Sequence, residues 1–560
     1  MTTAMPSPSR PHSSLPSDSH GDERTLPRLF LDAARRNWGR LAMADSTGRR
    51  LTFGEALVGG MLLRRLVLRH CPSAEDERMI GLLLPPSVPT ALLNVSISMA
   101  GRIPVNLNYT ASLASLEVSV KHCGIRTIFT SRQLVERLSF PPTLGGARLV
   151  MMEDVAPAMS RVRKAFYFAA ARLLPRSLLA RWILPPGIGC ASLATVIFSS
   201  GSVGAPKGVM LSHRNIIANL EGVQQAIHVT KRDCILGILP VFHAFGFTVG
   251  LWLPLVSGFS VAFHSNPLEA RTVGDLCRKY RATILVTTPT FAWEYVRRVH
   301  PEDFTSLRLA IVGAEKMKLE LAVAFKEKFG HELYQGYGCT ELSPVVSVET
   351  PEDFDAAGFG PRRDTVGRPI PGVEARVVDL QTGKDAPSGA EGMLLIRGPS
   401  VMMGYLGDPV RTRDAIRDDG WYVTGDLARL DARGFITITD RLTRFSKIGG
   451  EMVPHAQVEE ALQQALGTAE PRFVVAGIPD EQRGERLVVL HTELDLGVDE
   501  LLRRLRESNL PRLWLPKREN FFRVDVLPVL GSGKLDLKSV KDLAQRLASI
   551  VAAPSSDSTG

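Results

Sequence analysis

The chain has 560 residues, and since a typical domain holds roughly 100–200, its length predicts more than one domain with sizeable apolar cores. Hydrophobic residues make up 44% and charged residues 22%, which excludes a wholly disordered protein, a collagen and a coiled coil. The net charge of +9 is modest for this length and does not select among anionic partners; we expect no nucleic-acid partner.

The two ends of the chain are predicted to be disordered tails, residues 1–24 and 553–560. The first is rich in Ser and Pro and lacks the apolar core of a secretion signal. The six cysteines are scattered singly without zinc spacing, so we expect a reducing, cytoplasmic location and no structural metal. The most apolar stretch, residues 79–101, is interrupted by three prolines and predicts no membrane-spanning helix.

From residue 25 to 440 the sequence alternates short β-branched runs with amphipathic helical stretches. That alternation predicts an α/β domain with largely buried strands. A smaller β-rich part follows at 395–407 and in a hairpin at 423–441, with its turn at 432–434. The clearest predicted strands of the α/β part lie at 195–200, 233–240, 283–289 and 308–314.

Residues 441–552 are predicted to form a second, compact α+β domain, with the boundary near Asp440. Helical and strand patterns alternate again over this segment. The predicted elements are a helix at 455–466, strands at 473–478 and 486–494, a helix at 498–508 and a strand at 520–528.

Residues 161–186 stand apart as a basic helical insertion with six cationic residues, no acidic ones and several aromatics. A basic helix with an aromatic face is typical of segments that lie on a membrane surface. The alternative is a surface helix that packs over the large domain.

The most informative segment, residues 196–213, is an apolar strand followed by a loop rich in Ser and Gly. Glycines let backbone N–H groups point at phosphate oxygens, serines add hydroxyl donors, and a lysine adds mobile positive charge. The spacing differs from a Walker loop, because Pro206 and Gly208 stand where that pattern needs Gly and Ser or Thr. The predicted phosphate-binding residues are Ser199, Ser200, Gly201, Ser202, Gly204 and Lys207.

This loop resembles the signature of the adenylate-forming superfamily of acyl-CoA synthetases, luciferases and peptide-synthetase adenylation domains. The resemblance covers nearly the whole chain outside the tails. It implies a large N-terminal domain, built of two α/β subdomains and a small β-rich one, and a small mobile α+β C-terminal domain. Seven further motifs follow in order, at 239–246, 312–317, 334–344, 366–372, 420–435, 441–454 and 527–536.

Within the superfamily, the chain is most similar to the synthetase half of bacterial acyl-acyl-carrier-protein synthetase/2-acylglycerophosphoethanolamine acyltransferase. The acyltransferase half of that subgroup has no counterpart in this sequence, so we do not expect this chain alone to re-esterify lysophospholipid. The segments that carry this likeness are 108–113, 127–133, 313–316, 444–453 and 527–534.

The resemblance also implies which residues bind ATP and Mg²⁺. Glu341 would ligate Mg²⁺ and Thr340 would hydrogen-bond the α-phosphate, while Asp426 and Arg441 would hold the ribose. The adenine slot would consist of Gly313, Ala314, Glu315 and Tyr337, with Gly336 and Gly338 beside that tyrosine.

The small domain would supply the remaining catalytic groups. By resemblance, Lys534 would bridge the substrate carboxylate and the α-phosphate, and Gly449 and Gly450 would lie on the face that turns toward the incoming thiol. Lys447 matches a further lysine position of the family and is predicted to bind the cofactor. His243 matches the position that gates the acyl site. Thr443 and Asp440 depart from the family pattern at the hinge, which bears on the energetics of domain rotation and not on the chemistry.

Two other matches are interpreted as structural. His228 and Asp233 have the spacing of a glycerolipid acyltransferase motif, but we assign them to a turn before the strand at 233–240. Cys339 lies beside Glu341, and we expect no covalent role for it.

The leading hypothesis is an AMP-forming ligase that activates a medium- or long-chain fatty acid and transfers it to CoA or holo acyl-carrier protein, with peripheral contact to the inner face of the membrane. Two alternatives stay open. One is an adenylating enzyme without thiol transfer, such as a β-lactone synthetase or a fatty-acyl-AMP ligase. The other is a catalytically silent, membrane-peripheral acyl-binding protein.

Overall fold

The computed structural model describes residues 24–71, 73, 77–155, 161–199, 206–355, 364–448, 451–468, 470–480, 484–508, 510–529 and 535–552. Its largest element is a nine-stranded sheet in the order β16-β15-β14-β13-β12-β10-β11-β1-β2. The six strands from β14 to β1 are parallel, and antiparallel strands close both edges. The strands are β1 (Leu41–Asp45), β2 (Arg50–Thr52), β10 (Cys234–Gly237), β11 (Ser260–Phe263), β12 (Ile284–Thr287), β13 (Leu309–Val312), β14 (Leu333–Gly338), β15 (Val345–Val348) and β16 (Arg368–Pro369).

A second α/β unit lies beside the first and contains a five-stranded sheet, β4-β3-β5-β7-β6, in which only β6 runs antiparallel. The prolines of the apolar segment 79–101 separate a strand from a helix: β3 ends before Pro85, and the Ser87 side chain caps α3 (Val88–Met99). The strands are β3 (Met79–Leu83), β4 (Ile103–Asn106), β5 (Thr127–Thr130), β6 (Thr143–Leu144) and β7 (Ala147–Met151).

Two antiparallel sheets make up the β-rich part. One has the order β19-β9-β8 and the other β17-β18-β20-β21, and the hairpin predicted at 423–441 is the pair β20–β21. The strands are β8 (Leu193–Ser199), β9 (Lys207–Ser212), β17 (Glu374–Val378), β18 (Glu391–Arg397), β19 (Gly404–Tyr405), β20 (Tyr422–Leu430) and β21 (Ile436–Arg441).

Helices of the large domain bury their apolar faces against these sheets. Reciprocal capping boxes fix two of their starts, Thr52 with Glu55 at α2 and Ser212 with Asn215 at α9. The helices are α1 (Leu26–Arg36), α2 (Phe53–His70), α4 (Leu113–His122), α5 (Arg132–Arg137), α6 (Met152–Val155), α7 (Arg161–Leu173), α8 (Arg176–Ile183), α9 (His213–Ala226), α10 (Leu253–Ser257), α11 (Ala270–Tyr280), α12 (Pro289–Arg298), α13 (Leu319–Phe329), α14 (Pro351–Asp355) and α15 (Pro409–Ala415).

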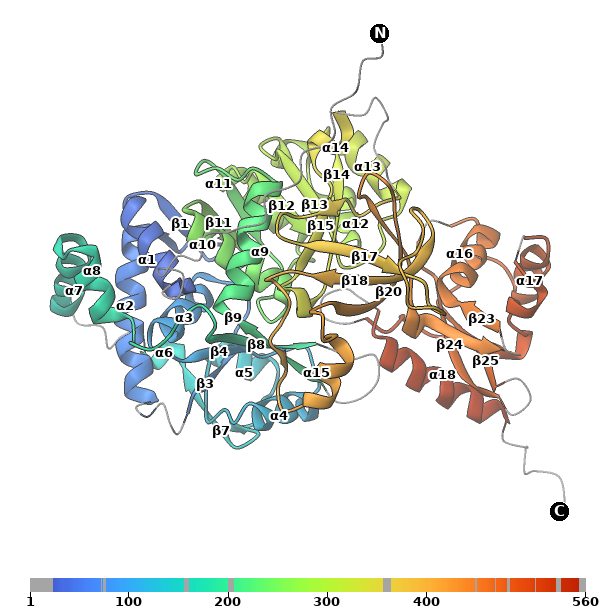
Figure 1. Ribbon diagram of the computed structural model, residues 1–560, viewed down its shortest axis with the longest axis horizontal. Helices are drawn as coiled ribbons and strands as arrows, with labels where there is room; N and C mark the ends of the chain where they lie inside the picture. The colour runs from blue at the N-terminus through green and yellow to red at the C-terminus, as the bar shows by residue number, and fades with distance from the viewer. Residues whose placement is uncertain are drawn as a thin grey trace, which may run out of the picture.

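The C-terminal unit has its own sheet, β23-β22-β25-β24 with β26 on β25, and two buried clusters on the two sides of that sheet. It lies at the opposite end of the molecule from α7 and α8 (Figure 1). Its elements are β22 (Phe445–Ile448), β23 (Glu451–Pro454), α16 (His455–Leu466), β24 (Phe473–Asp480), β25 (Gly484–His491), α17 (Val498–Arg506), β26 (Phe521–Arg523) and α18 (Leu537–Ala552).

The predicted architecture is confirmed: α/β subdomains, a small β-rich part and a smaller α+β unit at the C-terminal end. The expectation of one basic helix at 161–186 is wrong, because Pro175 separates α7 from α8; proline lacks the N–H that would continue the helical hydrogen-bond ladder. Among the described ranges, no helix combines the length and apolarity that crossing a bilayer requires.

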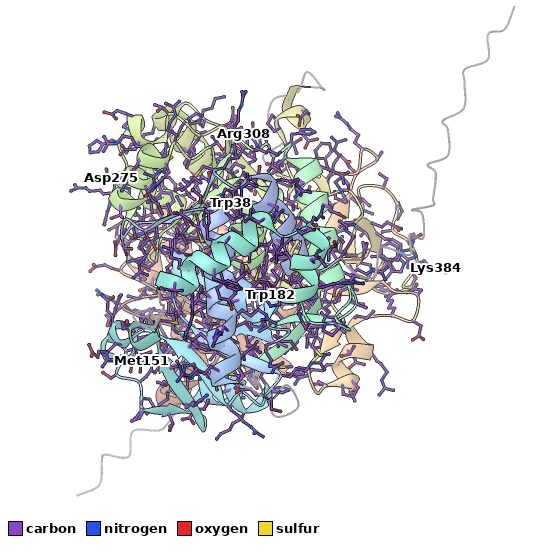
Figure 2. The ribbon with its side chains drawn as sticks, turned by 90° about the vertical axis from the view of Figure 1, so that its left-hand side faces the viewer. Trp38, Met151, Trp182, Asp275, Arg308 and Lys384 are labelled. Carbon is purple, nitrogen blue, oxygen red and sulfur yellow. The ribbon has the colours of Figure 1, made fainter. Side chains whose placement is uncertain are left out.

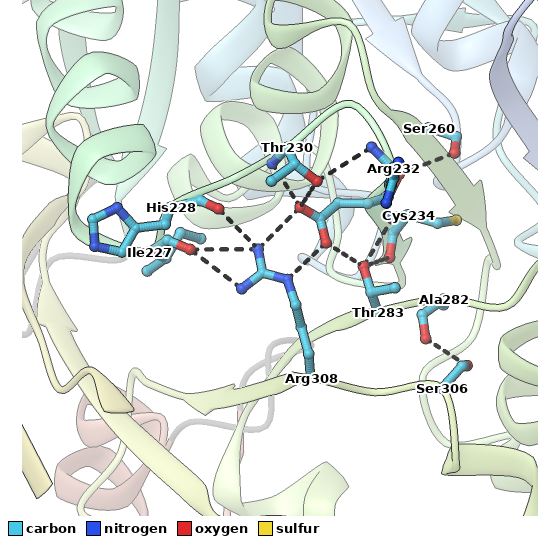
Figure 3. A network of polar contacts seen from close by, with 11 residues as sticks. Ile227, His228, Thr230, Arg232, Cys234, Ser260, Ala282, Thr283, Ser306 and Arg308 are labelled. Carbon is cyan, nitrogen blue, oxygen red and sulfur yellow. Dashed lines mark hydrogen bonds and ion pairs between the residues drawn. The ribbon is translucent and has the colours of Figure 1, made fainter. Parts of the chain in front are cut away.

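An ion pair between a buried carboxylate and a partly exposed guanidinium joins the amino ends of three parallel strands (Figure 3). The predicted site is at the carboxyl ends of the strands, on the opposite side of the sheet. Arg308, just before β13, donates to both carboxylate oxygens of Asp233, just before β10, at 2.7 and 3.0 Å. Thr283, just before β12, donates to the same carboxylate at 2.7 Å. Burial opposes ionisation of Asp233, but these hydrogen bonds outweigh it and lower the pKa of the carboxyl group.

Removing the guanidinium should therefore leave a buried carboxylate without its cation. We expect Arg308→Leu to lower the free energy of unfolding by about 1.5–3 kcal/mol, measured by urea denaturation at pH 7, because the guanidinium is partly exposed. The matched control is Arg132→Leu, which breaks the exposed pair with Asp154 and should cost less than about 1 kcal/mol. A loss in Arg308→Leu no larger than in the control would contradict this role.

Candidate active site

The predicted site residues gather at the carboxyl ends of parallel strands, where ligands bind in open α/β sheets. The segment that begins with Gly313 follows β13, and Thr340 with Glu341 follows β14. The segment that contains His243 follows β10. Three stretches that are far apart in sequence thus meet at one edge of the sheet.

The predicted phosphate loop connects β8 to β9. These strands are antiparallel, and Ser199 is the cross-strand partner of Lys207. The two residues therefore flank the mouth of the loop, as a phosphate-binding hairpin requires. Ser200, Gly201, Ser202 and Gly204 lie outside the described residues, so their contribution stays a prediction.

A tyrosine joins the loop lysine to the predicted metal ligand. The Tyr405 hydroxyl donates to Oε1 of the buried Glu341 at 3.0 Å, and the Lys207 ammonium lies 5.2 Å from the centre of the Tyr405 ring. The Tyr422 hydroxyl is hydrogen-bonded to that of Tyr405. Burial, followed by the Glu341 charge, raises the pKa of Tyr405, so this phenol stays protonated and its hydrogen bond orients the carboxylate.

The predicted adenine slot is formed where β13 and β14 end side by side. A methyl group on Gly313 would lie 3.1 Å from the Gly336 carbonyl oxygen, so the two segments are nearly in contact. Ala314 has a positive φ of 76°, and the Glu315 carboxylate accepts from the Thr290 hydroxyl at 2.7 Å. Only glycine fits at position 338, because a Cβ there would lie 2.0 Å from the Pro344 carbonyl oxygen.

Asp426 joins this slot to the β-rich part. The Tyr337 hydroxyl donates to its Oδ2, and Arg441 Nε lies 3.1 Å from its Oδ1. Asp426 and Arg441 are cross-strand partners in the β20–β21 hairpin. The carboxylate is buried, whereas the Arg441 side chain is half exposed. A buried acceptor and a half-exposed cation are thus available at the predicted ribose position.

The charges of the predicted ribose and metal-ligand residues act on one another. The charge of Asp426 raises the pKa of Arg441, and Tyr337, Cys339 and Glu341 act in the same direction, against the effect of burial. Burial, and then the charge of Asp426, raises the pKa of Tyr337 well above its usual value.

His243 lies in a tight turn that follows β10. Its ring is 4.6 Å from that of Phe242, which in turn packs edge-on against Tyr109 at 5.0 Å. Phe245, two residues further on, approaches Gly313, where a methyl group would lie 3.4 Å from its ring. The turn thus connects an aromatic wall to the adenine segment, a placement compatible with gating an acyl site.

The C-terminal unit contacts the large domain through α16 and the residues that follow it. Lys318 Nζ donates to Gln463 Oε1 at 2.8 Å, and Arg297 pairs with Glu470 at 2.5 Å. Lys447 lies on β22 opposite Met452. Gly449, Gly450 and Lys534 lie outside the described residues, and their roles stay predictions.

The hinge region contains a carboxyl group with an altered pKa. Burial raises the pKa of Asp440 to about 6, against the opposing effects of the Arg441 N–H, which donates to it at 2.7 Å, and of the Arg444 charge. Thr443 lies in a short 3-10 helix, Leu442–Arg444, between β21 and β22. These two departures from the family pattern thus stand at the connection between the units.

The acyltransferase-like spacing is structural, as expected. The Asp233 carboxylate accepts hydrogen bonds from Arg308, Thr283 and the Thr230 N–H (Figure 3). The His228 side chain is exposed, and its Nε2 lies 3.6 Å from Glu352 Oε1. The pair cannot act as a catalytic dyad, because its carboxylate serves another network.

Sequence reasoning missed three residues that shape the site. Tyr422 lies within the motif at 420–435 and Tyr405 within the predicted β-rich segment at 395–407, but only the fold shows that the Tyr405 hydroxyl donates to Glu341 and is itself hydrogen-bonded to Tyr422. Glu349 follows β15 and accepts from the Gln335 N–H at 2.8 Å and from the Thr365 hydroxyl at 3.1 Å. It thereby supports the strand that carries Tyr337, and a lone Glu after an apolar run gives no signal of this.

Comparison with known proteins identifies the class. The family model for AMP-binding enzymes matches residues 30–406, and the chain belongs to this family. It is 27% identical over 544 residues to a long-chain-fatty-acid–CoA ligase of Bacillus subtilis, covering 91% of this chain and 93% of the relative. It is 28% identical over 516 residues to 4-coumarate-CoA ligase 1 of Narcissus pseudonarcissus, covering 90% of each.

A solved structure shares the fold. ATP-bound MatB from Rhodopseudomonas palustris superposes with a TM-score of 0.77 at 23% identity, covering 94% of this chain and all of that one. The fold of the large domain and of the C-terminal unit is therefore common to the two proteins.

Glu349 generates a prediction about pH. Burial raises the pKa of its carboxyl group from the usual 4.5 to about 8. Between those values the folded protein binds a proton that the unfolded chain releases, so stability falls as pH rises through that window, by up to about 1.4 kcal/mol per pH unit. Glu349→Gln should remove this fall, so the free energy of unfolding of the variant minus that of wild type should increase from pH 5 to 8.

The measurement is urea denaturation at several pH values. Exposed Glu327→Gln, on α13, is the control and should follow the wild-type pH dependence. Parallel curves for Glu349→Gln and wild type across this range would show that Glu349 is ionised in the folded protein.

Proposed function

We propose that the protein is an AMP-forming acid–thiol ligase that activates a long-chain fatty acid. The observation that carries the proposal is the convergence of Lys207 and Glu341 on Tyr405, next to the Asp426 clamp. The Lys207 cation, beside the predicted phosphate loop, suits the phosphates of a nucleoside triphosphate. The Glu341 carboxylate, after the parallel strand β14, suits the metal ion that accompanies them.

In the first step, a carboxylate oxygen of the fatty acid attacks the α-phosphorus of ATP, the bond to the bridging oxygen breaks, and pyrophosphate leaves. Positioning and charge neutralisation supply most of the catalysis in such a transfer. Lys207 would hold the terminal phosphates, Thr340 the α-phosphate, and Asp426 with Arg441 the ribose. Lys534 would bridge the substrate carboxylate and the α-phosphate.

The donor set at Glu341 fits Mg²⁺. This cation commonly takes one or two protein carboxylates and completes its shell with phosphate oxygens and water. One oxygen of Glu341 accepts from Tyr405, which fixes the carboxylate plane and leaves the other oxygen to ligate. When bound, Mg²⁺ would neutralise phosphate charge.

In the second step, a phosphopantetheine thiol attacks the acyl carbon, and AMP leaves. The names of the relatives support CoA as the acceptor, and the sequence likeness to acyl-carrier-protein synthetases makes holo carrier protein the alternative. One relative is named for a long-chain fatty acid and the other for 4-coumarate, an aryl acid. These are the two substrate classes to compare.

The experiment combines the purified protein with ATP and Mg²⁺, and follows pyrophosphate release with palmitate, octanoate or 4-coumarate. CoA and holo acyl-carrier protein are added in separate reactions to follow thioester formation. We expect palmitate-dependent pyrophosphate release and palmitoyl-CoA. Pyrophosphate without either thioester would indicate an adenylating enzyme without thiol transfer, and no pyrophosphate with any acid would indicate a silent acyl-binding protein.

The proposed metal site predicts that Glu341→Gln raises the Mg²⁺ concentration needed for half-maximal pyrophosphate release by about tenfold or more, because the neutral amide attracts the dication weakly. The assay is an Mg²⁺ titration at fixed ATP. Exposed Glu320→Gln on α13 serves as control and should match wild type. Superimposable titrations for Glu341→Gln and wild type would place the metal elsewhere.

The proposed role of Lys534 predicts that Lys534→Ala slows ATP–pyrophosphate exchange by about 100-fold or more, while thioester formation from supplied acyl-AMP persists. A contact made mainly in the transition state is worth about 3–4 kcal/mol, by analogy with oxyanion donors. Lys538→Ala, exposed on α18, is the matched control. Exchange within about threefold of wild type in Lys534→Ala would rule the assignment out.

A further inference from the structure

The helix pair α7–α8 presents an apolar face to solvent at the end of the molecule farthest from the C-terminal unit (Figures 1 and 2). Val162 and Phe166 are one helical turn apart on α7 and are 78% and 60% exposed. Leu178 and Trp182 are one turn apart on α8 and are 50% and 42% exposed. Each helix therefore carries an exposed stripe.

Ring contacts join the two stripes into one surface. The Phe166 and Trp182 centroids are 6.0 Å apart, and Tyr167 stacks on Trp182 at 5.5 Å with an interplanar angle of 14°. Leu173, 78% exposed, lies two turns beyond Phe166 and extends the surface. We call Val162, Phe166, Leu173, Leu178 and Trp182 the outer face.

The outer face is presented by an anchored unit. The opposite sides of the two helices bury Ala171, Leu179 and Ile183. Arg176 pairs with the buried Asp32 of α1, and Arg35 of α1 donates to the Leu174 carbonyl at 3.0 Å. Because buried contacts and an ion pair fix the helices, the exposure of the outer face is built into the fold.

The charges around this face are of one sign. Residues 161–186 contain no Asp or Glu. Arg163, Lys164 and Arg181 are exposed, and within the described parts of the chain no ion pair involves them. Unpaired cations beside exposed aromatic and aliphatic side chains match a surface with anionic headgroups above acyl chains.

We infer that the outer face and its three cations form a docking surface for an anionic lipid bilayer. Phe166, Leu178 and Trp182 would enter the interfacial region, and Arg163, Lys164 and Arg181 would contact lipid phosphates. Aromatic rings favour the level of the headgroups, where one side is apolar and the other wet. Docking needs no ATP or acyl substrate, so it stands or fails independently of the proposed ligase activity.

The test is co-sedimentation with vesicles of phosphatidylglycerol and phosphatidylcholine in equal parts, with pure phosphatidylcholine vesicles for comparison. We expect binding to the anionic vesicles at low salt that falls as salt rises. Changing Arg163, Lys164 and Arg181 together to Gln should weaken partitioning on the order of 100-fold, at about a fivefold loss for each cation near the surface.

A matched control changes three exposed cations on other faces, Arg271, Lys384 and Arg413, to Gln. It removes the same charge and should keep wild-type binding to within about threefold. An equal loss in both triple variants, or no binding of wild type to anionic vesicles, would overturn the proposal.

A second readout tests whether the outer face enters the bilayer. Brominated lipids quench nearby tryptophan, and Trp182→Phe should lose most of that quenching while it still sediments with vesicles. Unchanged quenching would place the contact elsewhere. If Phe166→Ser with Trp182→Ser instead converts a wild-type dimer to monomer in light scattering, a second copy covers this face and the proposal is wrong.

Discussion

The buried carboxylate of Asp426 is the contact on which the geometry of the candidate site depends. It accepts from Tyr337 at the end of β14 and pairs with Arg441 at the end of β21. The first partner belongs to the nine-stranded sheet, and the second is the last residue of β21, at the start of the connection to the C-terminal unit. A single buried charge thus connects the predicted adenine slot to that connection, and its burial makes an unpaired state costly.

The rest of the site is built by the same rule, in which polar groups are oriented by partners before a ligand arrives. Tyr405 orients Glu341 and is itself hydrogen-bonded to Tyr422, and Glu349 supports the strand that carries Tyr337. Such pre-organisation suits the proposed electrostatic catalysis, because little reorganisation is needed when phosphate charge develops. At the far end, the outer face of α7–α8 differs, since its apolar side chains are exposed to solvent.

Much of this could be predicted from the sequence, since the informative signals are local. Strands that become β8, β10, β12 and β13 are short β-branched runs, and the β20–β21 hairpin is marked by its turn. Lys207, Glu341 and Asp426 could be selected as candidate site residues from the sequence motifs that contain them. Contacts between distant segments could not be predicted: nothing in the sequence places Tyr405 on Glu341 or Arg308 on Asp233. Pro175 indicates a break between α7 and α8, but the basic and aromatic residues continue on both sides of it and favour the interpretation as one helix.

The central claim is that a carboxylate oxygen attacks the α-phosphorus of ATP, and isotope transfer tests it most directly. Palmitate labelled with oxygen-18 in both carboxyl oxygens is incubated with the protein, ATP, Mg²⁺ and CoA. The isotope content of the products is then measured by mass spectrometry. The account predicts AMP that carries one labelled oxygen, with unlabelled pyrophosphate. Label in inorganic phosphate together with ADP would show attack at the γ-phosphorus and would contradict the account.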